Sequence, residues 1–282
     1  DGKYNLKGLP AVYAAEEEAQ TLIIYMKDQV TGLQVELLYG VLPEYDVITR
    51  SAKVINTEED KIRLTKAQAA CIDFVHGEFD IISFYGRHAM ERNMQRTPAG
   101  HGAFVIGSRR GTSSHQYNPM MILAEKETTE DAGTCYGMSF VYSGGFKAEV
   151  EKDQFGQTRM QMGLQEEQFS YPLEKGEEFV IPEVMLTCSS QGLGKLSQNL
   201  QRCIRKNLCR GKYKEKVRPV LINSWEACYF DFTGEDIYHL AEQAKDLGID
   251  MVVLDDGWFG SRNDDNSGLG DWKVNEEKLQ GS

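Results

Sequence analysis

The clearest fold signal in this sequence is PVLINSWEACYFDFTGEDIYHLAEQAKDLGIDMVVLDDGWFGSRNDDNSGLGDW, from Pro219 to Trp272. Pro219 to Trp225 is a short apolar run that is typical of a buried strand, and Ile249 to Leu254 is a second run, rich in β-branched residues. Between them, Thr233 stands before an acidic first turn as a helix N-cap, and Gly248 follows the last apolar residue of the helical pattern. The stretch therefore predicts a strand, a helix and a second strand parallel to the first.

Two carboxylates, Asp255 and Asp256, follow directly after the second predicted strand. In parallel α/β folds, ligands bind at the carboxyl ends of the strands. A pair of carboxylates there can accept hydrogen bonds from a polyhydroxylated ligand, although a turn or helix-capping role for either one is the ordinary alternative. Trp225 ends the first predicted strand, where its ring can form one wall of a sugar site or pack in the core.

The sequence before this stretch is rich in short β-strand patterns. Thr21 to Lys27, Leu33 to Tyr39 and Val47 to Ile55 are β-rich runs separated by turn residues, and similar runs continue to about residue 187. Many short strands with turns between them favour an antiparallel sandwich. Lys195 to Cys209 changes to helical spacing, and a basic segment follows up to Arg218, so we interpret residues 191–218 as a helical linker.

Several of these segments closely resemble the α-galactosidases of glycoside hydrolase family 36. The resemblance is carried by NSWEACYFDF, LDDGWFG and SGLGDW in the last part of the chain, and upstream by RRGTSSHQYNP (109–119), VYSGGF (141–146) and DQFGQTRMQMG (153–163). It implies an antiparallel β-sandwich (a supersandwich) over residues 1–190, the linker at 191–218, and the start of a catalytic (β/α)8 barrel over residues 219–282. A complete barrel typically needs about 250 residues. We therefore expect this chain to be a fragment that lacks sequence at both ends.

The resemblance also implies a function for the whole protein. It is expected to release terminal α-D-galactose from oligosaccharides of the raffinose and melibiose type, with retention of configuration through a covalent intermediate. Asp255, Asp256 and Trp225 would bind the substrate, and the nucleophile and acid/base are expected beyond Ser282. No metal or cofactor is expected, because carboxylates suffice for this chemistry. An α-N-acetylgalactosaminidase, an α-galactosyl transferase or a non-catalytic sugar-binding module remain alternatives.

Composition limits the classes of partner. The 282 residues are 41% hydrophobic and 26% charged, with a net charge of −12 and a pI of about 5.0, which argues against nucleic acid. No apolar run reaches the roughly 20 residues of a transmembrane helix, so we expect no membrane partner. The six cysteines are irregularly spaced and indicate a reducing compartment, hence a cytoplasmic protein. We also expect the full-length protein to be a homo-oligomer.

Other polar or aromatic residues are weaker candidates. His115 lies in a long polar loop without a partner for acid–base work, and Glu226 is more simply read as a structural residue paired to a basic side chain. Trp258 and Trp272 can pack beneath loops. Segment 264–268 fails the calcium-loop pattern and predicts a polar turn.

Overall fold

The structure, a computed structural model, describes residues 2–280 and divides into two compact units. Unit 1 is Asp1–Cys209 and unit 2 is Arg210–Ser282. Each unit is described by itself below.

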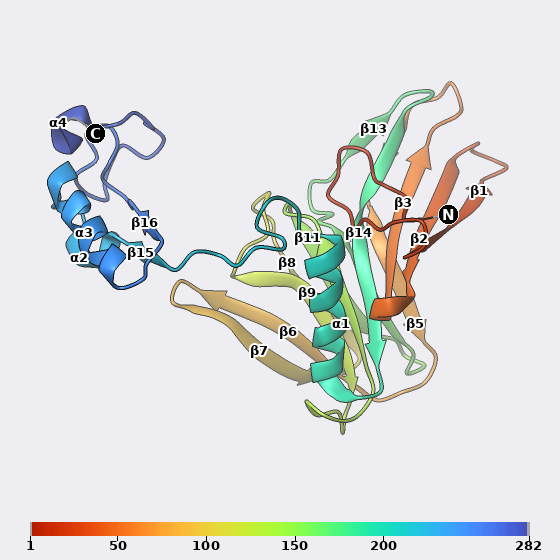
Figure 1. The fold of residues 1–282 in the computed structure, drawn as a ribbon. Coiled ribbons are helices and arrows are strands. Elements are labelled where there is room, and N and C mark those ends of the chain that lie inside the picture. Colours follow the sequence, from red (N-terminus) through yellow and green to blue (C-terminus); the bar gives the residue numbers. More distant parts are fainter. Residues whose placement is uncertain (1, 281–282) are drawn as a thin grey trace. The chain divides into compact units, whose positions relative to one another are not determined.

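The larger sheet of unit 1 has eight antiparallel strands, in the order β1-β2-β3-β14-β10-β9-β6-β7 (Figure 1). β14 is the longest of them and lies inside the sheet, where it pairs with β3 on one side and β10 on the other. The eight strands are β1 (Gln20–Lys27), β2 (Gln34–Leu42), β3 (Val47–Ile55), β6 (Phe79–Arg87), β7 (Met90–Pro98), β9 (Tyr117–Glu125), β10 (Cys135–Val141) and β14 (Glu178–Ser189).

A second sheet of four antiparallel strands completes the sandwich, in the order β5-β12-β11-β8. Its strands are β5 (Gln68–Phe74), β8 (Gly102–Gly107), β11 (Phe146–Lys152) and β12 (Thr158–Leu164). A short pair, β4 (Ile62–Leu64) with β13 (Tyr171–Leu173), and the 3-10 turn η1 (Pro43–Tyr45) lie outside both sheets. The predicted antiparallel sandwich is confirmed.

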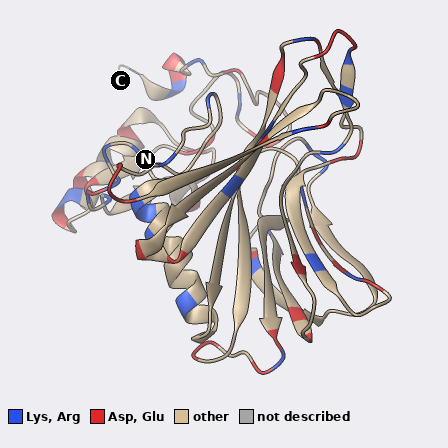
Figure 2. Ribbon diagram, turned by 90° about the vertical axis from the view of Figure 1, so that its right-hand side faces the viewer, with Lys and Arg blue, Asp and Glu red and all other residues tan. Residues whose placement is uncertain are grey.

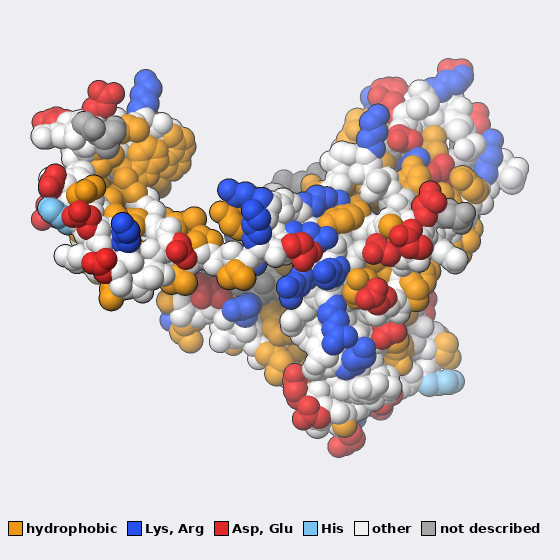
Figure 3. All heavy atoms as spheres, viewed as in Figure 1, with side chains coloured by type: hydrophobic (Ala, Val, Ile, Leu, Met, Phe, Trp, Pro, Cys, Tyr) orange, Lys and Arg blue, Asp and Glu red, His pale blue; other side chains and the backbone are white. Residues whose placement is uncertain are grey.

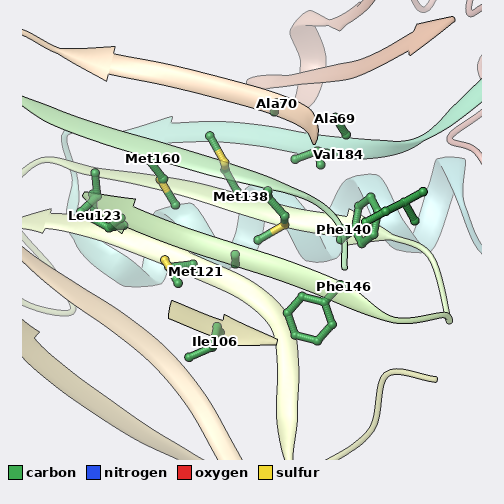
Figure 4. Close-up of a cluster of buried hydrophobic side chains, with 14 of the residues drawn as sticks. Ala69, Ala70, Ile106, Met121, Leu123, Met138, Phe140, Phe146, Met160 and Val184 are labelled. Atoms are coloured by element: carbon green, nitrogen blue, oxygen red, sulfur yellow. The ribbon is translucent and has the colours of Figure 1, made fainter. Parts of the chain in front are cut away.

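The main core of unit 1 lies between the two sheets (Figure 4). Met121 and Met138 come from the large sheet, and Phe146 and Met160 come from the small one; none of the four side chains is more than 1% exposed. Flexible methionine side chains fill irregular gaps between twisted sheets without polar atoms to satisfy. Alternation along the strands places these residues on the inner faces of the two sheets.

Helix α1 (Gly192–Asn207) forms a third layer of unit 1, against the outer face of the large sheet (Figure 1). Leu196, Leu200 and Cys203 are at most 4% exposed and belong to a second core cluster that also contains Met185 of β14. Basic side chains, including Arg205 and Lys206 in the last turn, gather on its exposed face (Figure 3). They also complement the negative end of the helix dipole.

The structure therefore differs from the predicted domain limits at this helix. Residues 191–218 were predicted to form a helical linker, whereas α1 is packed into unit 1, which extends to Cys209. The reason is the apolar face of α1, which has the spacing of a core-facing helix and covers the large sheet. Residues 208–220 lie between the end of that packed helix and the next strand.

The first residues of unit 1 are attached to its last elements. Lys3 forms a buried ion pair with Glu183 of β14, Nζ to Oε1 2.5 Å, and the backbone N–H of Val12 donates to Glu183 Oε2 at 2.8 Å. The backbone N–H of Tyr13 donates to the carbonyl of Asn207, and the Asn207 amide donates to the carbonyl of Tyr13, both at 2.8 Å. The segment before β1 is thus part of the folded unit.

Unit 2 contains the predicted strand–helix–strand arrangement. β15 (Leu221–Asn223) and β16 (Met251–Val253) are parallel, with Leu221 opposite Met251, and α3 (Gly234–Asp246) connects them. Thr233 caps α3 through a reciprocal pair of hydrogen bonds with Asp236, and Gly248 has φ +76°, which suits glycine. Two single-turn helices, α2 (Trp225–Cys228) and α4 (Glu276–Leu279), complete the unit.

Charges of both signs are interspersed over the ribbon (Figure 2). Among the residues that the structure describes, no helix is long and apolar enough to cross a membrane.

Candidate functional site

The candidate site is built where the two parallel strands of unit 2 end. β15 ends at Asn223 and β16 at Val253, and the carboxyl ends of parallel strands meet at one edge of the sheet. The Ser224 backbone N–H donates to the Val253 carbonyl at 3.0 Å, and the Ser224 hydroxyl accepts from the Asp255 backbone N–H at 3.1 Å. Ser224 is 1% exposed. These contacts fix the backbone from which Asp255 and Asp256 project.

Asp255 is held by uncharged donors. The Asn223 side-chain amide donates to Asp255 Oδ2 at 2.6 Å, and the Asp256 backbone N–H donates to Oδ1 at 2.7 Å. Each carboxylate oxygen can accept about two hydrogen bonds. Asp255 therefore keeps acceptor capacity on both oxygens.

Asp256 is held by a buried arginine. Arg262 Nε donates to Asp256 Oδ1 at 2.7 Å and Oδ2 at 2.9 Å, and the Gly257 backbone N–H donates to Oδ1 at 2.8 Å. The Arg262 side chain is 4% exposed and that of Asp256 is 21% exposed. The hydrogen bonds from Arg262 hold the pKa of the Asp256 carboxyl below its ordinary value, against the opposing effect of burial.

Trp225 belongs to the same cluster, but its position differs from the prediction. The predicted strand stops at Asn223, and Trp225 is instead the first residue of α2. Its backbone N–H donates to Asn223 Oδ1 at 2.8 Å, which helps to turn the chain into the short helix. The half-buried indole packs edge-on against Tyr229 and Phe230, with ring centroids 5.2 and 5.0 Å apart.

Two residues of this cluster, Asn223 and Arg262, were not among the predicted site residues. The Asn223 amide contacts two predicted site residues, because its oxygen accepts from Trp225 and its nitrogen donates to Asp255. A polar side chain near the end of the predicted strand, two residues before Trp225, was the signal that could have identified it. For Arg262 the signal was weaker, a single basic residue in the acidic loop that follows Asp255 and Asp256.

The weaker candidates lie elsewhere or have other partners. His115 is exposed in unit 1. Glu226 accepts a hydrogen bond from the Tyr229 hydroxyl at 3.1 Å, so the predicted pairing with a basic residue is wrong. Trp258 and Trp272 stack on each other with centroids 6.5 Å apart, and Asp264 accepts from the Asn266 backbone N–H in a polar turn.

Within residues 2–280, no three His, Cys, Asp or Glu side chains are arranged to hold a metal ion. The cluster instead has oriented acceptors and an aromatic side chain, which suits hydroxyl groups and the C–H face of a sugar ring.

Comparison with known proteins agrees with both units. Residues 1–174 match the model described as "Glycosyl hydrolase family 36 N-terminal domain", and residues 178–282 match the model described as "Melibiase". The fold and these two matches thus define the class as a glycosyl hydrolase family in which a β-sandwich domain precedes a domain that begins with a β/α unit. The chain belongs to glycoside hydrolase family 36, and the resemblance found in its sequence is confirmed.

Individual relatives are similar over the whole chain. The bifunctional α-galactosidase/sucrose kinase AgaSK of Mediterraneibacter gnavus is 65% identical over 282 residues, and α-galactosidase Mel36A of Lactobacillus acidophilus is 47% identical over 280 residues. The chain covers 30% and 38% of their lengths. The solved galactosidase domain of AgaSK superposes with a TM-score of 0.96, covering 100% of this chain and 39% of that one.

The solved structure of α-galactosidase AgaA of Geobacillus stearothermophilus is 46% identical in sequence and has a TM-score of 0.96. The match covers 99% of this chain and 39% of the AgaA chain. Solved variants of AgaA are complexes with stachyose and with raffinose. The chain therefore spans well under half the length of each of these relatives.

Proposed function

We propose that the protein to which this chain belongs is an α-galactosidase that releases terminal α-D-galactose from raffinose- and melibiose-type oligosaccharides. The observation that carries the proposal is the family match, which extends over both units and includes the site cluster. It is supported by the α-galactosidase names of the relatives and by the stachyose and raffinose complexes of AgaA.

In this proposal the chain supplies substrate binding rather than bond cleavage. Asp255 and Asp256 accept hydrogen bonds from galactose hydroxyls, and Trp225 provides an apolar wall. A retaining glycosidase also needs a nucleophilic carboxylate and an acid/base carboxylate about 5–5.5 Å apart, which act through a covalent glycosyl-enzyme. We place both in the part of the relatives' length that this chain does not cover.

The test compares two proteins on p-nitrophenyl α-galactoside and raffinose. A protein that carries this chain with a complete catalytic domain should hydrolyse both with retention, whereas the 282-residue chain alone should show no turnover above an empty-vector preparation. Turnover by the chain alone would overturn the assignment of the catalytic pair. Preference for the N-acetylgalactosaminide, transfer without hydrolysis, or binding without turnover would instead support the corresponding alternatives.

We further propose that the complete protein is a homo-oligomer. This is supported by exposed apolar side chains on the β6–β7 ribbon at one edge of the large sheet, where Tyr85, Met90 and Met94 are 44%, 50% and 59% exposed. Exposed apolar groups gathered on one element are typical of interaction surfaces. Light scattering after size-exclusion chromatography tests it; a monomeric mass at micromolar concentration would contradict it.

We also propose a reducing, cytoplasmic location. It is supported by the state of the cysteines, all six of which are free, and burial raises the pKa of the Cys203 thiol to about 12. Fractionation of the producing cells tests it; recovery with secreted proteins would contradict it.

A further inference from the structure

We propose that Arg262 is a positioning residue of the site, which fixes Asp256 as an ionised acceptor for one sugar hydroxyl. The inference rests on the proposed function for the nature of the ligand. Its structural part, the hold of Arg262 on Asp256, can be tested without any substrate.

Arg262 is itself held in place by the loop around it. Its Nη1 donates to the Ser267 carbonyl at 2.5 Å, and its guanidinium lies 5.7 Å from the centre of the Phe230 ring. The loop backbone is shaped around it, because a Cβ at Gly268, where φ is +82°, would lie 3.0 Å from Arg262 Cβ. A fixed arginine loses little conformational freedom when it binds a carboxylate, so it can set the orientation of Asp256.

The Arg262 side chain is also buried, which strengthens its ion pair with Asp256. An exposed ion pair contributes little, because water screens both charges. Arg262 is 4% exposed, whereas Arg159 and Asp73, which form a similar Arg–Asp pair in unit 1, are 52% and 53% exposed. Without Asp256, the buried Arg262 guanidinium would keep only one ion-pair partner, the 82% exposed Asp265, whose Oδ1 lies 3.7 Å from Nη2, so Asp256 and Arg262 must be retained together.

The two carboxylate oxygens of Asp256 differ in how many hydrogen bonds they already accept. Asp256 Oδ1 receives hydrogen bonds from both Gly257 and Arg262, whereas Oδ2 receives one only, from Arg262. Because an oxygen can accept about two, Oδ2 is the atom left to bind a ligand. Asp255 has no charged donor and instead depends on the Asn223 amide. The neighbouring aspartates are therefore held by different donors, and the hydrogen bonds from Arg262 lower the pKa of the Asp256 carboxyl.

The substrate-free test measures carboxyl titration by NMR in a protein with a complete catalytic domain, labelled with carbon-13 at the aspartate carboxyls. Arg262→Met should raise the pKa of Asp256, because its charged donor is lost. Arg262→Lys keeps a charge without the two-oxygen geometry and should give a smaller rise. An unchanged Asp256 titration in Arg262→Met would overturn the proposal.

The kinetic test uses a protein with a complete catalytic domain. Arg262→Met should lower kcat/KM roughly ten- to a hundred-fold, as expected when an oriented charged hydrogen bond is lost, and Arg262→Lys should recover part of the loss. The acidic limb of the kcat/KM profile should also move to higher pH, which general loosening of the fold would not produce. If Arg262 acts through Asp256, Arg262→Met in an Asp256→Asn background should add little further loss. Additive losses or an unmoved acidic limb would overturn the positioning role.

Arg159→Met is the matched control, because it breaks the exposed Arg159–Asp73 pair of unit 1. It should leave the pKa of Asp256 unchanged and kcat/KM within about two-fold of wild type. An inactive wild-type protein would overturn the proposed function alone, since the NMR titration would still decide the role of Arg262.

Discussion

Asp255 and Asp256 are neighbours in the sequence, but different donors hold them. Asp255 accepts hydrogen bonds from the Asn223 side-chain amide and from a backbone N–H. Asp256 accepts hydrogen bonds from the buried guanidinium of Arg262. The sequence could predict that two carboxylates follow a strand end, because that depends on local order alone. It could not predict their partners, since Asn223 lies 32 residues before Asp255 and is brought to it only by parallel pairing of β15 and β16.

Replacing either aspartate by asparagine should weaken galactose recognition in a protein with a complete catalytic domain. A hydrogen bond to a charged group contributes about 1.5–3 kcal/mol, so kcat/KM should fall roughly ten- to a few hundred-fold for Asp255→Asn and Asp256→Asn. Only Asp256→Asn should also lower the melting temperature, because it leaves the buried Arg262 with the exposed Asp265 carboxylate, 3.7 Å from its Nη2, as its ion-pair partner. If both variants had wild-type kinetics and a lowered melting temperature, Asp255 and Asp256 would be structural residues and not substrate-binding ones.

The Asp256–Arg262 pair should also give a defined pH dependence of stability. The folded-state pKa of Asp256 lies below the unfolded value of about 3.9. The charged carboxylate therefore adds stability above that value and loses it as the pH falls through the folded-state pKa. We expect the difference in unfolding free energy between wild type and Asp256→Asn, measured by urea denaturation, to shrink below about pH 4. A difference that stays constant down to pH 2 would contradict this.

The buried pair of Lys3 and Glu183 should be a large single-residue contribution to unit 1. Both side chains are at most 3% exposed, so Glu183→Gln would leave the Lys3 charge buried without its counter-ion. Breaking such a pair costs about 3–5 kcal/mol, measured as the free energy of unfolding in urea. Glu174→Gln is the control, because the Lys61–Glu174 pair is 48% and 58% exposed and should matter by less than about 1 kcal/mol. Equal effects of the two variants would contradict the argument.

Among the elements, those with local signals were predicted best. Helix α3 was predicted because Thr233 caps its start and Gly248 follows its end, and both signals act within a few residues. The order of strands in the large sheet has no such signal. β14 pairs with β3, more than 100 residues earlier in the chain, and periodicity along either strand does not identify its partner. Helix α1 was predicted as a helix, but its spacing alone could not show which surface its apolar face covers.

The packing of α1 on the sandwich makes a prediction that a linker helix would not. Leu196 is 0% exposed against the large sheet, so Leu196→Ala should destabilise unit 1 by about 2–5 kcal/mol. Arg202→Ala, on the exposed face of the same helix, should change stability by less than about 0.5 kcal/mol. Thermal and urea unfolding followed by circular dichroism measure both. If Leu196→Ala had a negligible effect on the stability of unit 1, α1 would be a linker helix and not part of the packed unit.

At the scale of the whole molecule, the two units differ in how much core they contain. Both hydrophobic clusters lie in unit 1, whereas the described part of unit 2 buries only four hydrophobic residues: Phe232, Ala244, Phe259 and Leu279. Unit 2 has a two-stranded sheet, and hydrophobic side chains are exposed on its visible face (Figure 3). Such a small core gives little independent stability.

Limited proteolysis of the 282-residue chain should therefore separate the units. Trypsin should cleave first within the basic segment 210–218 and leave a resistant fragment that ends close to Cys209 with α1 intact. Mass spectrometry of the fragments measures the cleavage sites. Early cleavage inside α1, or a resistant fragment formed by residues 219–280, would contradict the division.

The position of β14 also has a consequence for synthesis on the ribosome. β14 is the last strand of the large sheet to be translated, yet it lies between β3 and β10, so the sheet exists as two separate halves until β14 emerges. Because synthesis proceeds at about 5–20 residues per second, the edge of β3 stays unpaired for on the order of ten seconds before β14 is made. During that time its unpaired backbone can bind strands of other nascent chains. Slow codons between β3 and β14 would lengthen this exposure, and chaperones that cover strand edges would matter most for this part of the protein.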